Sequence, residues 1–138
     1  MSSRNTNTGG VLEAMVLPAL KMGGYECDQQ VEVGRRPGGR KHMVDAVARK
    51  DARRVLVSLK WQQVSGTAEQ KVPFEIICLV MAQRTGSYDA AYLVLGGEGW
   101  TLRDFYVSGG LKESICYGDE LKIVTLESFI ALANQGRL

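Results

Sequence analysis

Residues 41–75, KHMVDAVARKDARRVLVSLKWQQVSGTAEQKVPFE, decide the fold that this sequence predicts. They predict two β-strands joined by a charged turn, then a polar turn and a helix. The first strand carries one acid, Asp45, among apolar neighbours. The second carries Ser58, Lys60 and Gln62 at alternate positions, so the three side chains project from one face. An acid on one strand, a lysine on the next and acids on the following helix suggest a cluster that binds a metal and cuts phosphodiesters.

Length and composition predict one globular domain. The 138 residues suffice for one well-buried core and are too few for two ordinary domains. With 45% hydrophobic and 23% charged residues, the chain resembles folded rather than disordered proteins. We expect a flexible polar tail over residues 1–10 and a single domain over residues 11–138.

Positive charge is concentrated in one part of the chain. The net charge is only +2, but between Arg35 and Lys60 nine Lys or Arg residues accompany two acids. Such a surface attracts phosphates and makes nucleic-acid binding salt-dependent. The alternative is a hairpin whose charged face is merely solvated. The residues that we expect to contact DNA are Arg35, Arg36, Arg40, Lys41 and Arg53.

Cysteine spacing and hydropathy favour a cytoplasmic protein. Cys27, Cys78 and Cys116 are widely spaced and form no C-x-x-C pair, which argues against a structural zinc site. The longest apolar run, Ile76–Ala82, is too short to span a bilayer, and no signal peptide is visible. We therefore expect a reduced, cytoplasmic setting without membrane association.

The elements predicted along the chain give the order α-β-β-β-α-β-(α)-β-α. They are a helix over 11–22, strands over 25–33, 42–48 and 55–62, a helix from 67 to 83, a strand over 91–95, a short helix or irregular segment over 100–107, a strand over 121–124 and a helix over 126–134. The three strands that are close in sequence predict an antiparallel meander. The whole predicts a mixed sheet with helices on both sides.

Local signals mark where the helices begin and bend. Pro18 should bend the first helix or restart it after Leu17. Thr67 and Gln70 fit a capping box, and Pro73 predicts either a kink or a helix start nearer Val72. Thr125, with Ser128 close by, opens the last helix.

Motif and element order together resemble the PD-(D/E)XK nuclease superfamily. The resemblance rests on VDAVA around Asp45, SLK ending at Lys60 and the helix that follows, and it covers roughly residues 11–95. It implies an α/β fold of the restriction endonuclease-like type, with an αβββαβ core and a mixed central sheet flanked by helices. The residues alone predict the same order of elements. The short motif is weak by itself and more specific within this order of elements.

The resemblance implies a catalytic role for several strand residues. Asp45 would be the metal-binding aspartate, preceded here by Val44 instead of proline, and Lys60 the lysine that positions or activates the attacking water. Gln62, on the face of Lys60, would orient water or touch the scissile phosphate. His42, the sole histidine, is expected at the surface or at the DNA. The alternative for Asp45 and Lys60 is an ordinary strand acid and an exposed strand lysine.

The resemblance also requires a second acid, and Ser58 stands in its place. A serine cannot supply that negative charge. Some members of the superfamily carry the second acid on the following helix, which implies Glu75, fifteen residues after Lys60, and Glu69 as the next candidate. Glu13 would reach the site from the leading helix. Each of these glutamates also has an ordinary explanation, for example a first-turn acid that favours the helix dipole.

The resulting expectation is a Mg²⁺-dependent DNA endonuclease, with Mn²⁺ as a substitute for Mg²⁺. So small a nuclease would act as a homodimer or higher oligomer, cutting in the manner of restriction or homing enzymes or resolving Holliday junctions. The alternative is a catalytically inactive nucleic-acid-binding module on the same fold, for which Ser58 is the best argument. A third interpretation is a small α+β domain with an unrelated binding role.

Overall fold

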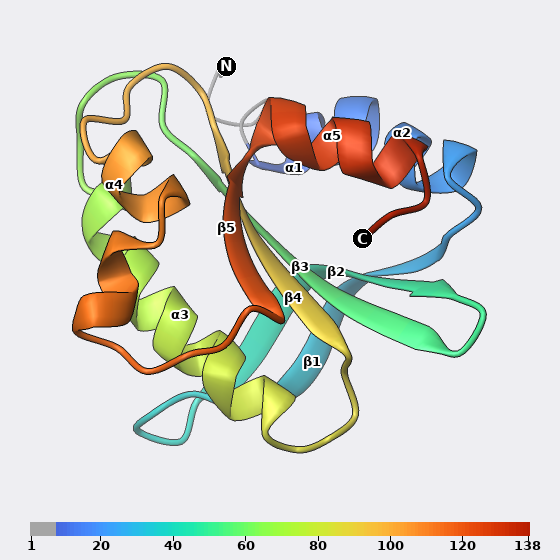
Figure 1. The fold of residues 1–138 in the computed structure, drawn as a ribbon, viewed down its shortest axis with the longest axis horizontal. Coiled ribbons are helices and arrows are strands. Elements are labelled where there is room, and N and C mark those ends of the chain that lie inside the picture. The colour runs from blue at the N-terminus through green and yellow to red at the C-terminus, as the bar shows by residue number, and fades with distance from the viewer. Residues whose placement is uncertain (1–7) are drawn as a thin grey trace.

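Five strands form one sheet in the order β1-β2-β3-β4-β5 (Figure 1). The computed structural model describes residues 8–138. Neighbouring strands are antiparallel from β1 to β3, whereas β4 runs parallel to β3 and β5 runs parallel to β4. The bounds are Glu26–Arg35 for β1, Lys41–Lys50 for β2, Arg53–Trp61 for β3, Ala90–Gly96 for β4 and Leu121–Thr125 for β5. The predicted meander and the mixed sheet are therefore confirmed.

Helices cover both faces of this sheet (Figure 1). One layer contains α1, the π-helix η2, α2 and α5, and the other contains α3, α4 and the 3-10 helix η3. The bounds are Thr8–Val11 for α1, Leu12–Val16 for η2, Leu17–Met22 for α2, Ala68–Gln83 for α3, Arg103–Val107 for α4, Gly110–Glu113 for η3 and Leu126–Asn134 for α5. Within residues 8–138 no helix has the length and hydropathy that crossing a membrane requires. The predicted α/β class and αβββαβ core are confirmed.

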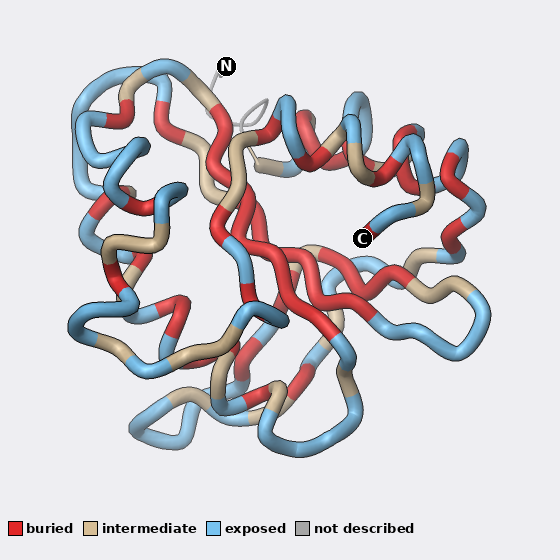
Figure 2. The backbone as a smooth tube through the Cα atoms, viewed as in Figure 1, coloured by how far each residue is buried: buried red, intermediate tan, exposed pale blue. Residues whose placement is uncertain are grey.

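The centre of the sheet is buried on both faces, which explains its long apolar runs. All seven residues of β4 are buried, because helices on both sides exclude water (Figure 2). Alternate residues of β3 divide between two clusters: Val57 packs with Phe129 of α5, and Leu56 packs with Ile76 of α3. α3 therefore packs against one face of the sheet, which fixes its position.

Pro73 lies inside α3 without ending it. Proline donates no backbone N–H, so the carbonyl of Glu69, four residues earlier, loses its helical partner. The Tyr106 hydroxyl of α4 donates to this carbonyl at 2.7 Å and replaces that partner. The alternative start near Val72 was wrong, because α3 begins at Ala68.

The two predicted helix caps have different outcomes. Thr125 Oγ1 accepts the Ser128 N–H at 3.2 Å, so this cap is confirmed. Thr67 makes no side-chain cap bond, and the predicted capping box with Gln70 is wrong. The physical reason is that Thr67 already has helical backbone angles, φ −89° and ψ −6°, whereas a capping side chain needs an extended backbone.

The N-terminal segment leads directly into the first helical layer. Of the predicted tail, residues 1–7 lie outside the described residues, and residues 8–10 belong to α1. At Pro18, where a bend or a restart after Leu17 was predicted, the segment changes from π-helix to α-helix without a break: Val16 and Leu17 both have helical backbone angles, and Pro18 lies in the first turn of α2. The N–H of Leu17 donates to the carbonyl of Leu12, the wider π-helical spacing just before the proline.

Candidate active site

The carboxylate of Asp45 lies where β2 and β3 separate. The antiparallel pairing of the two strands continues from their hairpin as far as Ala46 and Val57. Beyond this pair, Asp45 Oδ2 accepts the backbone N–H of Leu59 at 2.6 Å. A side chain thus takes a place that backbone carbonyls occupy elsewhere in the ladder. The half-buried carboxylate is thereby fixed between the two strands.

β1 is irregular at the position opposite Asp45. Gln29 and Val31 pair with β2 on either side, which leaves Gln30 facing Asp45. Gln30 has φ +51°, a left-handed conformation that non-glycine residues adopt rarely and at a cost in strain. Burial has the largest effect on the pKa of the Asp45 carboxyl and raises it, whereas the Gln30 side chain is the smallest of the influences and opposes that effect. Gln30 is a neighbour of the site that the sequence did not reveal.

Ser58 and Lys60 bring β3 into the site on the side of α3. They alternate with Leu59, which packs on the other face of the sheet. The Ser58 hydroxyl donates to Glu75 Oε2 at 3.0 Å. Glu75 belongs to α3 and is only 7% exposed. The Glu75 carboxylate therefore lies beside the strand position that lacks an acid.

His42 of β2 is the second partner of Glu75. Its Nε2 lies 3.1 Å from Glu75 Oε2, and the residue is 2% exposed. The expectation that His42 lies at the surface was wrong. Its position alternates in phase with Val44, whose side chain packs in the core beneath α3. This alternation was the signal in the sequence that places His42 inside.

Opposing influences act on the pKa of Asp45. Burial is the largest and raises the pKa. The Leu59 N–H and the Lys60 ammonium lower it, and the charge of Glu75 raises it again. The net result is a pKa above the ordinary value. These mutual influences show that Asp45, Lys60 and Glu75 share one electrostatic environment.

Glu75 has the opposite balance. Burial is again the largest single influence and raises its pKa. The His42 hydrogen bond, the Lys60 and His42 charges and the Ser58 hydrogen bond together outweigh it, so the pKa lies below the ordinary value. Glu75 is thus held as a carboxylate, the form that binds metal ions.

Glu69 and Glu13 lie apart from this group. Glu69 Oε2 accepts the Thr101 hydroxyl at 2.6 Å, and Oε1 accepts the backbone N–H groups of Thr101 and Leu102, the latter at 2.7 Å. These bonds hold the loop after β4 against α3. Glu13 is exposed on η2, in the helical layer on the other face of the sheet. Within residues 8–138, no group of three or more acids, histidines or cysteines is placed to share one metal ion, so Asp45 and Glu75 are left as a pair of carboxylates.

Gln62 connects the loops that follow β3 and β4. It is 5% exposed, and its Nε2 donates to the Gly99 carbonyl at 2.8 Å. Its backbone N–H donates to the Gly96 carbonyl at 2.9 Å, and its carbonyl accepts the Gly99 N–H at 2.8 Å. Oε1 is buried and has no partner in the described part of the chain. Gln62 therefore holds this end of the sheet together, and its catalytic role stays a prediction.

The basic residues that were predicted to contact DNA lie at two ends of the sheet. The β1–β2 hairpin carries Arg35, Arg36, Arg40 and Lys41. Arg36 leans on α3, with its guanidinium carbon 5.3 Å from the Phe74 ring centre, one residue from Glu75. Arg53 begins β3 at the other hairpin, where its Nε donates to the Leu138 carbonyl at 2.8 Å. About six strand residues, roughly 20 Å, separate Arg53 from the Asp45 contact on β3.

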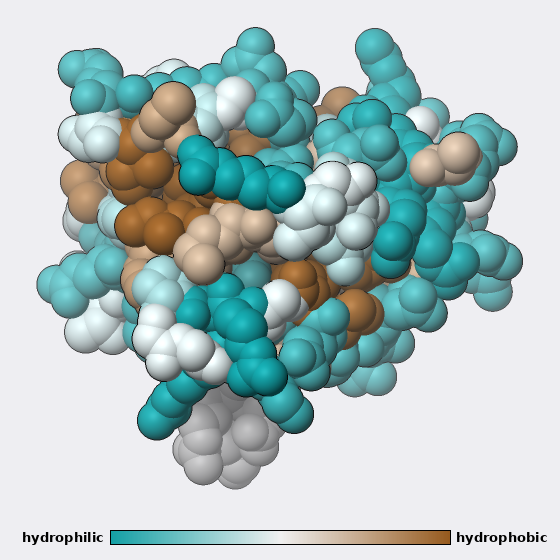
Figure 3. All heavy atoms as spheres, turned by 90° about the horizontal axis from the view of Figure 1, so that it is seen from below, coloured by the Kyte–Doolittle hydropathy of each residue, from teal (hydrophilic) through white to brown (hydrophobic). Residues whose placement is uncertain are grey.

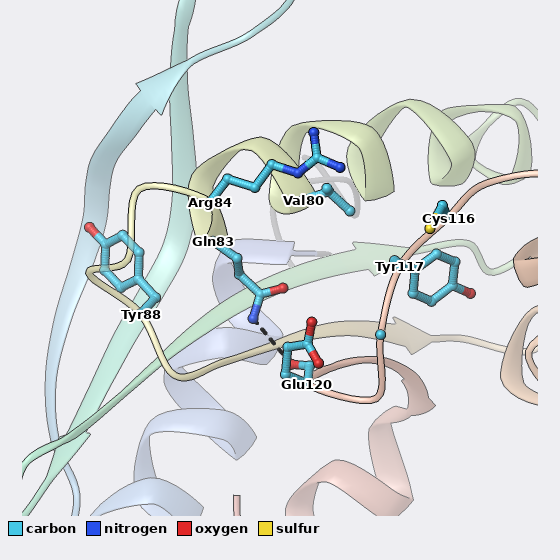
Figure 4. Close-up of a pocket in the computed structure, with 8 residues that line it drawn as sticks. Val80, Gln83, Arg84, Tyr88, Cys116, Tyr117 and Glu120 are labelled. Atoms are coloured by element: carbon cyan, nitrogen blue, oxygen red, sulfur yellow. Dashed lines mark hydrogen bonds between the residues drawn. The ribbon is translucent and has the colours of Figure 1, made fainter.

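A separate pocket of about 270 Å³ lies at the other end of α3 (Figure 4). Within it Gln83 Nε2 donates to the Glu120 carbonyl at 3.3 Å. Its lining residues are Val80, Gln83, Arg84, Tyr88, Cys116, Tyr117, Gly118 and Glu120. None of them is a predicted site residue, so this hollow lies outside the carboxylate cluster.

The chain matches one family of known proteins. The family model described as a PD-(D/E)XK nuclease superfamily domain matches residues 4–137. The chain is also similar to the crystal structure of AF1548, a protein of unknown function, at 12% sequence identity and a TM-score of 0.49. That similarity covers 80% of this chain and 54% of the other, so the present chain spans about half of its length. No curated protein matches the chain significantly. Because the family match covers nearly the whole sequence, the chain belongs to the PD-(D/E)XK nuclease superfamily.

Proposed function

We propose that this protein is a Mg²⁺-dependent DNA endonuclease that hydrolyses phosphodiester bonds. The observation that carries the proposal is that three neighbouring residues of β3 bring the groups together: Ser58 bonds to Glu75 of α3, the Leu59 N–H bonds to Asp45 of β2, and Lys60 follows directly. Membership of a nuclease superfamily supports a nucleic acid as the substrate. We further propose that residues 11–138 work as one domain.

The two carboxylates fit a divalent cation. Burial and the charge of Glu75 disfavour ionised Asp45, a cost that a cation bound by both groups would offset. His42 and Ser58 both bond to Oε2 of Glu75, while Oε1 accepts no hydrogen bond from residues 8–138. Carboxylate oxygens are the ligands that Mg²⁺ and Mn²⁺ prefer. Asp45 and Glu75 would hold the ion.

The residues of the site divide the chemistry of hydrolysis among them. A bound Mg²⁺ supplies positive charge at the phosphate and lowers the pKa of a water ligand. Lys60 adds a second positive charge on the same face, where it orients the attacking water or neutralises the charge that develops on the phosphate. Ser58 supplies no charge and keeps Glu75 in place through its hydroxyl.

Two copies would act together, one active site for each DNA strand. α3 offers apolar surface for such a contact: Phe74, Ile77 and Met81 are 39%, 39% and 40% exposed. Figure 3 shows one face of the molecule, on which exposed hydrophobic residues (brown) are surrounded by hydrophilic residues (teal). The spacing of two sites would decide between a double-strand cut and the paired nicks of a junction resolvase.

Cleavage of a supercoiled plasmid and of a four-way junction tests the proposal. We expect cutting with Mg²⁺, none with EDTA, and recovery with Mn²⁺. Lys60→Met should cut about 10²–10³-fold more slowly, because methionine keeps the length of the side chain and removes its charge. Lys71→Met, an exposed lysine of α3, should cut like wild type. Salt-sensitive DNA binding without cutting would identify an inactive nucleic-acid-binding module. A protein that neither binds nor cuts DNA would contradict the nuclease and the binding module alike.

The β1–β2 hairpin should carry part of the DNA contact. Each phosphate contact that is lost makes the plot of log affinity against log salt shallower by about 0.9, so Arg40→Ala combined with Lys41→Ala should lower the slope by about 2. Fluorescence anisotropy with a DNA duplex measures this slope. The salt concentration is varied between roughly 50 and 200 mM, where affinity for DNA changes strongly with salt. Lys21→Ala on α2 is the control for a lost charge. The same titration with Arg53→Ala shows whether the DNA extends to the far hairpin, in which case the slope falls by about 1.

A further inference from the structure

We infer that His42 is a positioning residue, which holds the Glu75 carboxylate in the orientation that metal binding requires. The inference rests on the proposed metal-dependent function and names a residue that the resemblance does not include. Its basis is the contact between His42 Nε2 and Glu75 Oε2 at 3.1 Å, between two side chains that are 3% and 9% exposed.

The two donors to Glu75 come from different strands. His42 belongs to β2 and Ser58 to β3, and both contact Oε2. A glutamate on a helix has three rotatable side-chain bonds and reaches many positions when nothing holds it. Two donors on one oxygen restrict the orientation of the carboxylate, and they leave the other oxygen, Oε1, without a hydrogen bond from residues 8–138. Glu75 on α3 can therefore be held as firmly as an acid at the strand position of Ser58 would be.

The direction of the histidine bond follows from the charge of its partner. An ionised carboxylate only accepts hydrogen bonds, so His42 Nε2 carries the proton and donates. The imidazole ring is planar and buried, and cannot turn away without leaving this acceptor. The Ser58 hydroxyl, in contrast, rotates freely about its C–O bond. His42 is thus the more directional of the two partners.

Most of the surroundings of His42 are apolar. A cavity of about 230 Å³ beside it is lined by Val33, Gly34, Met81 and Ala82, together with the polar residues Arg35 and Thr85. Within residues 8–138, the one side chain that bonds to His42 is Glu75. An apolar side chain at position 42 would pack there without needing a partner, whereas a buried imidazole needs one. The partner that the structure provides is the metal-binding candidate Glu75. A histidine at this position is therefore explained by what it does to that carboxylate.

Titration of the metal-free protein with Mn²⁺ by calorimetry tests this role. Loss of a hydrogen bond to a metal-ligating group typically costs about 10–100-fold in affinity or activity. His42→Leu, which fills the space and removes the donor, should therefore weaken Mn²⁺ binding by about 10-fold or more. His42→Gln, whose amide donates from a similar position, should restore most of that loss. The Mg²⁺ concentration for half-maximal cutting should move in parallel.

Val33→Ala is the matched control, because it enlarges the same cavity and removes no hydrogen-bond donor to Glu75. It should lower the melting temperature and leave Mn²⁺ affinity unchanged. If His42→Leu folds and binds Mn²⁺ as wild type does, the positioning role is overturned and the proposed function stands. If wild type itself binds no Mn²⁺ and cuts no DNA, both are overturned. Weaker binding in His42→Leu alone, rescued by His42→Gln, supports the inference.

Discussion

Asp45→Asn is expected to lose cutting and, without metal, to be at least as stable as wild type at neutral pH. Removing the charge of a metal ligand costs several kcal/mol of transition-state stabilisation, and about 4 kcal/mol corresponds to a rate about 10³-fold lower. Asparagine can still accept the Leu59 N–H through its amide oxygen, so the contact that fixes the strand end survives. The substitution thus separates what Asp45 does for the reaction from what it does for the fold.

The gain in stability follows from the direction of the pKa shift. Asp45 has a higher pKa in the folded chain than in the unfolded chain, chiefly because of burial. Its ionisation therefore destabilises the folded state at every pH above the folded pKa. This loss fades as the pH falls through the folded pKa and is absent below the unfolded pKa. Asparagine never ionises, so the variant escapes the loss at neutral pH.

Thermal melting in EDTA at several pH values measures the effect. We expect the variant to melt at or above the wild-type temperature at pH 7 and the difference to shrink as the solution is acidified. Asp89→Asn is the control, since Asp89 is an exposed acid that also accepts a backbone N–H, that of Arg54 at 2.8 Å. It should change neither cutting nor the pH dependence. A metal-free Asp45→Asn that melts well below wild type at pH 7 would contradict the burial argument.

The site was predictable where it depends on strand alternation. Asp45 and Lys60 lie on neighbouring strands of a short hairpin, and the spacing of Ser58 and Lys60 alone places both on one face. The position of Glu75 depends on how α3 crosses the sheet, which local sequence does not specify. Glu75 was therefore one candidate among three until the structure brought it to Ser58.

Long-range contacts decided what the sequence left open. Glu69 looked equivalent to Glu75, but its carboxylate binds Thr101 and Leu102, more than thirty residues later in the chain. His42 stands among charged hairpin residues and looked exposed, although α3 covers it. Gln30 has a left-handed backbone although it is neither glycine nor asparagine, the residues that usually indicate this conformation in a sequence.

The glycines after β4 should be as intolerant of change as the catalytic residues, for steric reasons. Gly97 has φ +91°, and a methyl group on it would lie 2.7 Å from the backbone carbonyl carbon of Gln62, with the carbonyl oxygen closer still. Both atoms belong to the main chain, which cannot move aside as a flexible side chain does. The Gln62 backbone is also bonded to Gly96 and Gly99, so any shift breaks those bonds.

Gly97→Ala is therefore expected to destabilise the protein by about 3 kcal/mol or more. A left-handed backbone costs alanine roughly 1–2 kcal/mol, and forcing an extra methyl into packed surroundings adds roughly 1–3 kcal/mol. Gly86→Ala isolates the first contribution: Gly86 has φ +80° and nothing within 4 Å of the added methyl. Urea unfolding of both variants gives the two free energies.

The difference between the two variants measures how rigidly the ends of β3 and β4 are joined. Gln62 follows Lys60 by two residues and comes directly after the end of β3 at Trp61, so a displaced Gln62 backbone displaces the lysine as well. We expect the folded fraction of Gly97→Ala to cut more slowly than wild type, and Gly86→Ala to cut normally. Equal losses of stability in the two variants would mean that the loop after β4 yields to the methyl group. In that case the position of Lys60 depends on the pairing of β3 with β4 alone, and the glycine loop contributes nothing to the site.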